Sequence, residues 1–183
     1  MKQRIFAFLL CVLLLLTLIP YAALADSPGD LIIYAKTIDR LSTRSGPSTQ
    51  YKDTGTYNDV MGTYVRVISR FDDAGGVCWL QCEIPVGSTL RRLYTGLKRF
   101  DTRTFDIDSV PLEEPYLFFQ AKVVMTSKAM YGPGYGYNTY GSLTVDKGQT
   151  VTVVAIEDDY AQVEWETAKQ MYRAWVPVST LVY

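Results

Sequence analysis

The chain offers few side chains that could carry out acid–base or nucleophilic chemistry. It has 183 residues and no histidine, which removes the usual general base for a serine or cysteine nucleophile and the commonest zinc ligand. A cysteine nucleophile needs a lowered pKa or a partnered base, and the sequence around Cys78 and Cys82 supplies neither. We therefore expect no catalytic residue, no metal and no cofactor, and we predict that the protein is not an enzyme.

The same two cysteines are poorly placed for a disulfide. They lie four residues apart on one expected strand, so at the usual rise per residue their Cα atoms would be ~13 Å apart. A disulfide tolerates a Cα separation of no more than ~7 Å. Cys78 and Cys82 are therefore expected to be free, buried thiols that pack as small apolar groups.

Two pairs of adjacent carboxylates are the clearest candidates for a metal or acid–base site. Asp72-Asp73 and Asp158-Asp159 both lie where a turn is expected, and adjacent strand residues would point to opposite faces of a sheet. We interpret them as turn residues that hydrogen-bond their own backbone. Asp72 and Asp158 stay candidates for contact with a ligand beside the turn.

The remaining charged residues are interpreted as solvated surface. Glu83 and Glu164 are expected on an exposed strand face. Attraction to an anionic polymer is the alternative for a late basic cluster, which consists of Arg91, Arg92, Lys98, Arg99 and Arg103. The formal net charge is −1, without the basic footprint of a nucleic-acid binder.

Tyrosine and glycine are concentrated between Tyr131 and Gly141. This segment lacks the Lys-Ser/Thr ending and the following helix of a phosphate loop. Tyrosines on a glycine-rich loop present rigid amphipathic contact area with little side-chain entropy to lose. We expect Tyr131 and Tyr135 to bind a ligand. For Tyr137 and its counterpart Tyr51, packing within the fold is the alternative to binding.

An internal repeat organises these residues. With a shift of 86 residues, nine positions coincide without a gap: Gly46, Pro47, Tyr51, Gly55, Gly62, Val65, Val67, Asp72 and Asp73 match Gly132, Pro133, Tyr137, Gly141, Gly148, Val151, Val153, Asp158 and Asp159. The first copy then carries five extra residues, Ala74 to Cys78, before Trp79 to Glu83 matches Tyr160 to Glu164. Glycine, proline and alternating valine fix backbone shape, so we interpret the chain as a duplicated fold.

The repeat also defines the candidate binding surface. Trp79 and Tyr160 begin matching strands beside the loops and would form the other wall of a groove. The candidate ligand-binding residues are Tyr131, Tyr135, Tyr137, Asp158, Tyr160 and Trp175 in the second copy, and Ser45, Tyr51, Asp72 and Trp79 in the first.

Each copy is predicted to consist of short strands. Residues 64–68 and 150–154 alternate around β-branched residues, as half-buried strands do, and residues 79–84 and 160–165 alternate similarly. No segment after the first 25 residues has helical periodicity with caps. We predict an all-β protein of two tandem small β-barrels, comprising residues 26–107 and 117–183, with a linker at 108–116 that prolines stiffen.

The first 25 residues have the pattern of a secretory signal peptide. Lys2 and Arg4 precede an apolar run from Ile5 to Ile19, and Ala23-Leu24-Ala25 has small residues at the −3 and −1 positions of a cleavage site. The run is shorter than the ~20 residues that cross a bilayer. We expect cleavage and secretion, with a retained membrane anchor as the alternative.

The first copy closely resembles the bacterial Src-homology-3-like (SH3-like) domain. That family typically has an Arg-Ser-Gly-Pro loop, seen here at Arg44 to Pro47, then Tyr four residues later and Gly a further four, as at Tyr51 and Gly55. Its Trp-x-x-Val strand is matched by Trp79 to Cys82.

The second copy is similar but divergent. It has Met130-Tyr131 where Arg-Ser is usual, and its Ala174-Trp175-Val176 looks like the family's closing Gly-Trp-Val. In the first copy, Gly96-Leu97 is expected at that place.

The resemblance implies two SH3-like barrels that bind peptidoglycan or its peptides. We therefore expect a bacterial extracellular or cell-wall-associated binding protein that recognises its ligand through the Tyr-rich loops. The alternative is an adaptor or regulator that docks on a separate cell-wall hydrolase. Nucleic acid is not expected as a partner, and a membrane is expected only if the signal peptide is kept.

Overall fold

Alternating valines build the strands as the repeat predicts. The computed structural model describes residues 32–113 and 118–183, which we call the first half and the second half; the predicted signal peptide lies outside them. In the segment Tyr64–Asp72, Val65 and Val67 are 1% and 3% exposed, while the preceding Tyr64 is 57% exposed. This two-residue period is that of a strand with one face on a core.

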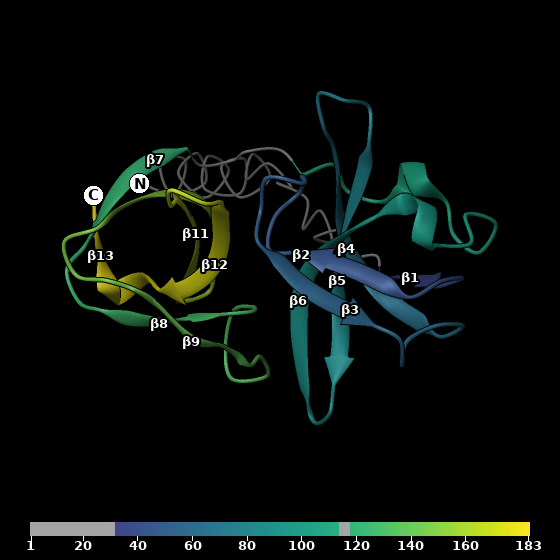
Figure 1. The fold of residues 1–183 in the computed structure, drawn as a ribbon, viewed down its shortest axis with the longest axis horizontal. Helices are drawn as coiled ribbons and strands as arrows, with labels where there is room; N and C mark the ends of the chain where they lie inside the picture. Colours follow the sequence, from purple (N-terminus) through teal and green to yellow (C-terminus); the bar gives the residue numbers. More distant parts are fainter. Residues whose placement is uncertain (1–31, 114–117) are drawn as a thin grey trace, which may run out of the picture. The chain divides into compact units, whose positions relative to one another are not determined.

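The first half forms one antiparallel sheet (Figure 1, purple to teal) with the order β1-β4-β5-β6-β2-β3. Its strands are β1 (Ile33–Lys36), β2 (Leu41–Arg44), β3 (Asp53–Tyr57), β4 (Tyr64–Asp72), β5 (Cys78–Val86) and β6 (Thr89–Gly96). Two short 3₁₀ turns follow, η1 (Leu97–Arg99) and η2 (Ile107–Ser109).

The second half forms another antiparallel sheet (Figure 1, green to yellow) with the order β13-β7-β10-β11-β12-β8-β9. Its elements are β7 (Phe119–Val123), β8 (Ser127–Met130), β9 (Thr139–Val145), β10 (Thr150–Glu157), β11 (Tyr160–Glu166), β12 (Met171–Pro177), η3 (Val178–Thr180) and β13 (Leu181–Val182). The described residues thus form an all-β structure, as predicted, and contain no helix long and apolar enough to span a membrane.

The two halves share strand order and local irregularities. Strands β1 to β6 correspond in sequence and in order to β7 to β12. The β4–β5 ladder is interrupted at Ile68, and the β10–β11 ladder at the matching Val154. Thr37 bridges Phe100 in the first half, as Val123 pairs with Leu181 in the second. Because a bulge has a specific place in a ladder, its repetition supports the interpretation of the chain as a duplicated fold.

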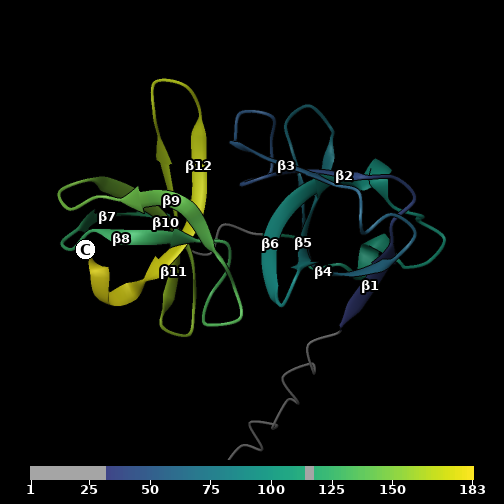
Figure 2. The ribbon, with the colours of Figure 1, turned by 60° about the horizontal axis from the view of Figure 1, so that its bottom comes forward.

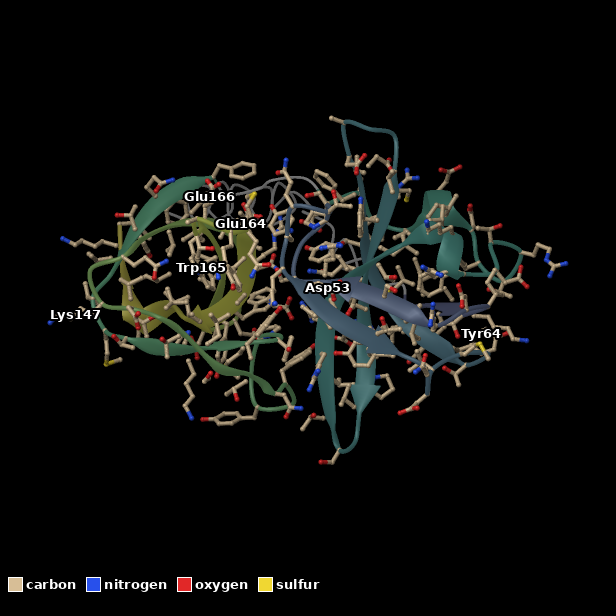
Figure 3. All side chains as sticks on the ribbon, viewed as in Figure 1. Asp53, Tyr64, Lys147, Glu164, Trp165 and Glu166 are labelled. Carbon is tan, nitrogen blue, oxygen red and sulfur yellow. The ribbon has the colours of Figure 1, made fainter. Side chains whose placement is uncertain are left out.

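Each half has its own apolar core, and the residues at corresponding core positions differ in size. Ala161 in the second core corresponds to Leu80 in the first, whereas the much larger Trp165 corresponds to Ile84. A loss of volume at one position and a gain at another keep the total volume of a core similar. Figure 3 shows Trp165 inside the curve of the second sheet.

The predicted linker packs along the first sheet before the chain reaches the second. Val110 is 2% exposed and belongs to the first core. Arg70 in β4 donates its backbone N–H to Pro111 at 2.8 Å and accepts one from Glu113 at 2.6 Å. Residues 110–113 therefore extend the first half, and residues 114–117 lie outside the described parts.

The expectation that Gly96-Leu97 takes the place of the closing motif in the first half is wrong. Trp175 pairs with Gln162 in the second sheet, and the matching Gln81 pairs with Tyr94 in the first. The counterpart of Trp175 is therefore Tyr94 and not Gly96-Leu97. The motif is hidden in the first half because a tyrosine replaces the tryptophan.

Two strands in each half are buried on both faces, where one solvated face was expected. Figure 2 shows β5 beside β6 and β11 beside β12. In β5, Leu80 and Cys82 face the core, yet Gln81 and Glu83 on the opposite face are only 5% and 6% exposed. Residues 32–183 form one compact unit, and the second faces of these strands are covered where the halves meet.

Candidate functional site

A network of two arginines, four glutamates and three tyrosines lies between the two halves. We call it the inter-half network: Arg92, Arg173, Glu83, Glu113, Glu157, Glu164, Tyr51, Tyr94 and Tyr137. Cross-strand pairing in β5–β6 places Glu83 opposite Arg92, and pairing in β11–β12 places Glu164 opposite Arg173. Both pairs lie on the sheet face that points away from the core.

Arg173 is the centre of one part of the network. Its Nε donates to Glu164 at 2.7 Å within the same half. Its Nη1 donates to Glu113 and, at 2.5 Å, to the hydroxyl of Tyr94, both in the first half. The hydroxyl of Tyr51 donates to Glu164 across the halves. Arg173 is 7% exposed, so these charges are held out of water and depend on one another.

Arg92 is the centre of the other part. It binds Glu83 at 2.9 Å within the first half and Glu157 at 2.6 Å in the second. The hydroxyl of Tyr137 donates to Glu83, and Arg92 also donates to that hydroxyl oxygen at 3.0 Å. The Tyr51–Glu164–Arg173 arrangement is thus repeated by Tyr137–Glu83–Arg92 at matching positions, with the halves exchanged.

The charges of this network are stabilised by their partners. Burial raises the pKa of Glu83, but the hydrogen bond from Tyr137 and the charge of Arg92 outweigh it and leave that pKa below its usual value. Burial, together with the hydrogen bond to Glu83, raises the pKa of Tyr137 to about 12. Both glutamate and tyrosine therefore keep their ordinary charge states near neutral pH, as a structural ion-pair network requires.

Several predicted binding residues belong to this contact between halves. Tyr51 and Tyr137 supply hydroxyls to the network, and Trp175 is 3% exposed beside Arg92, whose guanidinium carbon lies 5.5 Å from its ring centroid. Tyr131 is 9% exposed, packs with the core of the first half and lies with its ring centroid 4.6 Å from the guanidinium carbon of Arg91. Ser45 is 3% exposed and accepts the backbone N–H of Arg173 at 3.4 Å. The structure thus places these five residues in packing between halves.

Sequence reasoning missed the charged members of the network. Glu83 was expected to be solvated, which is wrong because it is 6% exposed, and Arg92 was expected in a solvated basic cluster but is 8% exposed. A signal was present, since a glutamate and an arginine recur nine residues apart in both copies, as Glu83–Arg92 and as Glu164–Arg173. Figure 3 labels Glu164 on β11.

A second candidate region is a groove of about 890 Å³ on the first half. Its lining includes the segment that only the first copy has, through Gly76, Val77 and Cys78, together with Trp79. Residues of β2, of the start of β3 and of η1 with the residues after it complete the lining, including Arg44, Asp53, Leu97, Lys98 and Phe100. The groove therefore combines apolar side chains with charges of both signs.

Asp73 fixes the shape of this groove. Its carboxylate accepts the backbone N–H groups of Gly75 and Val77, each at 2.9 Å, and the indole N–H of Trp79 at 3.0 Å. The hydrogen bond from Trp79, followed by that from Val77, lowers the pKa of Asp73. The expectation that this aspartate bonds its own turn is confirmed, and the same carboxylate orients the tryptophan.

The described part of the second half lacks the extra segment that lines this groove in the first half. Its β10 and β11 are joined by the two residues Asp158 and Asp159, and Asp158 adopts a φ of 52° in the left-handed region, as tight hairpin turns require. Tyr160 begins β11 and is half-buried. Asp72 ends β4 and is exposed, and Tyr135 is fully exposed. None of the predicted binding residues Asp72, Tyr135, Asp158 and Tyr160 lines the first-half groove.

Metal-ligating side chains and the two cysteines are also candidates for reactive groups. No group of three or more metal-ligating side chains is found in residues 32–113 and 118–183. Cys78 and Cys82 are free, as expected, but Cys78 is only half-buried. Burial raises the pKa of the Cys82 thiol, and burial together with Asp72 raises that of Cys78 to about 11, the opposite of an activated thiolate.

Comparison of the chain with models of protein families, with curated proteins and with solved structures found no match.

Proposed function

We propose that the protein is a non-catalytic, secreted bacterial binding protein whose halves are SH3-like barrels and whose ligand is a peptide of the cell wall. The Arg-Ser-Gly-Pro loop at Arg44 to Pro47 and the shared strand order of the two sheets support the fold assignment. The pattern of residues 1–25 supports export. The ligand site is the first-half groove.

The observation that carries this proposal is the groove beside Trp79. Asp73 holds both the extra segment and the indole ring in place, so the groove exists before a ligand arrives. A preformed concave site with apolar walls and a few fixed polar groups is the usual form of a small-ligand site, and preorganisation lowers the entropic cost of binding.

The charges at the groove favour a short peptide with both an amine and a carboxylate. Arg44, Lys98 and Arg99 contribute cations to its lining, and Asp53 and Asp73 contribute carboxylates. Val77, Leu97 and Phe100 supply apolar contact for side chains. Stem peptides of peptidoglycan combine these groups in a short chain.

The test is retention of the full-length secreted protein on purified peptidoglycan, followed by release with soluble stem peptides. Val77→Glu places a charge on the groove wall at a side chain that is 47% exposed, so it changes the groove with little effect on the core. We expect binding at least tenfold weaker, which is about 1.4 kcal/mol. Ile156→Glu is the matched control, since Ile156 is 42% exposed on β10, outside the groove.

Two results would contradict the proposal. One is a parent protein that peptidoglycan does not retain. The other is equal binding by parent and Val77→Glu together with a loss in Tyr135→Ala, which would return the site to the Tyr-rich loop. Release by glycan strands and not by stem peptides would show that the ligand is the sugar chain.

A specific surface also supports the adaptor alternative. Ile32, Tyr34 and Tyr64 are 58%, 52% and 57% exposed. The pairing of β1 with β4 makes Tyr34 and Tyr64 diagonal neighbours on one sheet face, and Figure 3 labels Tyr64 there. Crosslinking in cells followed by mass spectrometry discriminates the two functions: a captured hydrolase supports the adaptor, and captured wall fragments alone support the binding protein.

A further inference from the structure

The contact between the halves is reciprocal at its polar side chains. Tyr51 of the first half donates to Glu164 of the second, and the matching Tyr137 of the second half donates to Glu83 of the first. The guanidinium of Arg173 lies 5.6 Å from the ring centroid of Tyr51, and that of Arg92 lies 5.4 Å from the ring centroid of Tyr137.

The backbone contacts between the halves are reciprocal as well. Met171 pairs with the segment at Tyr51: its N–H donates to Gln50 at 3.1 Å and its carbonyl accepts from Lys52 at 2.9 Å. At the matching positions, the N–H of Leu90 donates to Gly136 at 2.9 Å and its carbonyl accepts from Asn138 at 3.4 Å. Each half thus offers its loop to the sixth strand of the other.

This reciprocity is the property of an isologous interface, in which residue i contacts j and j contacts i, as in a two-fold symmetric homodimer. Contacts that arose after the halves were joined would have no reason to use matching residues in both directions. Contacts already present between two copies of a single-repeat chain would be inherited in both directions by the fused chain.

We propose that the surface between the halves is a homodimerisation surface, and that its intermolecular partner is a second copy of this chain. In the monomer, each half occupies the surface of the other. When the two halves of one chain cannot meet, the halves of two chains pair with each other and form a dimer by exchange, with two copies of the same interface. Domain exchange of this kind keeps every contact of the monomer.

The experiment uses the full-length secreted protein lacking residues 114–117, so that Glu113 is joined directly to Phe118. The halves of one chain then have little freedom to dock, while the halves of two chains are free of that constraint. We expect twice the parental mass by light scattering, with thermal unfolding close to that of the parent. The proposal is independent of the groove, so peptidoglycan binding does not decide it.

A disulfide reports which halves are paired. Tyr51→Cys with Met171→Cys joins two residues that face each other across the halves, in a Cys78→Ser background because Cys82 is fully buried. The Leu90–Tyr137 contact stays intact. We expect the bond within one chain in the parent and between two chains in the shortened protein, with Tyr51→Cys alone as the control.

A folded monomer of the shortened protein, with the disulfide within one chain, overturns the proposal. If shortening prevents folding, the parent carrying both cysteines is refolded at increasing protein concentration before oxidation. A disulfide-linked dimer whose fraction rises with concentration supports the exchange, and a monomer at every concentration overturns it.

Discussion

The two halves share one surface and differ at another. At the surface where they meet, the first half has Tyr51, Glu83 and Arg92 and the second has the matching Tyr137, Glu164 and Arg173. At the first-half groove, the charged residues Arg44, Asp53, Lys98 and Arg99 correspond to the uncharged Met130, Thr139, Ser179 and Thr180, and only Asp73 has a charged counterpart, Asp159. The comparison teaches that the residues of mutual contact are kept in both halves, whereas most of the charged lining of the groove is present only in the first.

The largest expected effect on stability comes from a variant that breaks the part of the inter-half network centred on Arg173. Arg173→Ala leaves Glu113 and Glu164 without their cation, and these side chains are only 21% and 12% exposed. Removing one partner of a buried ion pair costs about 3–5 kcal/mol. Chemical denaturation should show this loss in the free energy of unfolding. Arg92→Ala should cost less, because its buried partner Glu83 keeps Arg66 at 3.1 Å and its other partner Glu157 is 47% exposed. An equal or larger loss in Arg92→Ala would contradict the difference between the two parts.

A smaller effect tests whether the two tyrosines are equivalent. Tyr51→Phe and Tyr137→Phe each remove one hydroxyl that donates to a buried carboxylate across the halves. A hydrogen bond to a charged group contributes about 1.5–3 kcal/mol, so each variant should lose that much by denaturation. Tyr64→Phe, at an exposed residue, is the control. If only one of the two variants loses stability, the two matching hydrogen bonds contribute unequally to the free energy of unfolding although their geometry is reciprocal.

The groove is removed by making the first half like the second. Deletion of Ala74 to Cys78 leaves Asp72 and Asp73 as a two-residue turn before Trp79, as Asp158 and Asp159 precede Tyr160. We expect binding to peptidoglycan at least tenfold weaker, about 1.4 kcal/mol, with thermal unfolding little changed. Retained binding by the folded deletion protein would show that the extra segment is not part of the site.

The strands could be predicted because their core faces carry apolar residues at a period of two and because the pattern occurs twice. Val65 and Val67, with Val151 and Val153, are all 3% exposed or less. The second faces of β5 and β11 could not be predicted, since Gln81 and Glu83 are residue types that usually face water. Their burial depends on a partner surface distant in the sequence, and no local pattern of a single strand reports that.

The candidate site was predicted in part for the same reason. Trp79 was placed in a groove because it begins a strand beside a turn, which depends on local spacing. Tyr51 and Tyr137 were placed either in binding or in packing, and the structure gives them hydroxyl partners 113 and 54 residues away in sequence. A tyrosine suits a ligand site and a polar internal interface equally well, so its residue type alone does not distinguish between them.

The smallest expected effect is on the pH dependence of stability. It compares Glu83 of the inter-half network with carboxylates outside that network. Because Tyr137 and Arg92 hold the pKa of Glu83 below its usual value of about 4.5, the unfolded chain takes up this proton at a higher pH than the folded one. The stability that Glu83 contributes is therefore complete above about pH 4.5 and is lost as pH falls through the folded pKa. Hydrogen bonds also lower the pKa of Asp73 and Asp101, so the parent has further acid-sensitive contributions.

Thermal unfolding between pH 7 and pH 3 separates the contribution of Glu83 from those of the other carboxylates. Glu83→Gln should unfold at a lower temperature than the parent at pH 7 and should then lose less stability on acidification, so that the two profiles converge at low pH. Glu166→Gln changes an exposed carboxylate on the same face of β11 as Glu164. Its stability profile against pH should run parallel to that of the parent. Parallel profiles for Glu83→Gln and the parent would mean that the buried carboxylate carries no proton linkage, and that the network is held by packing and not by charge.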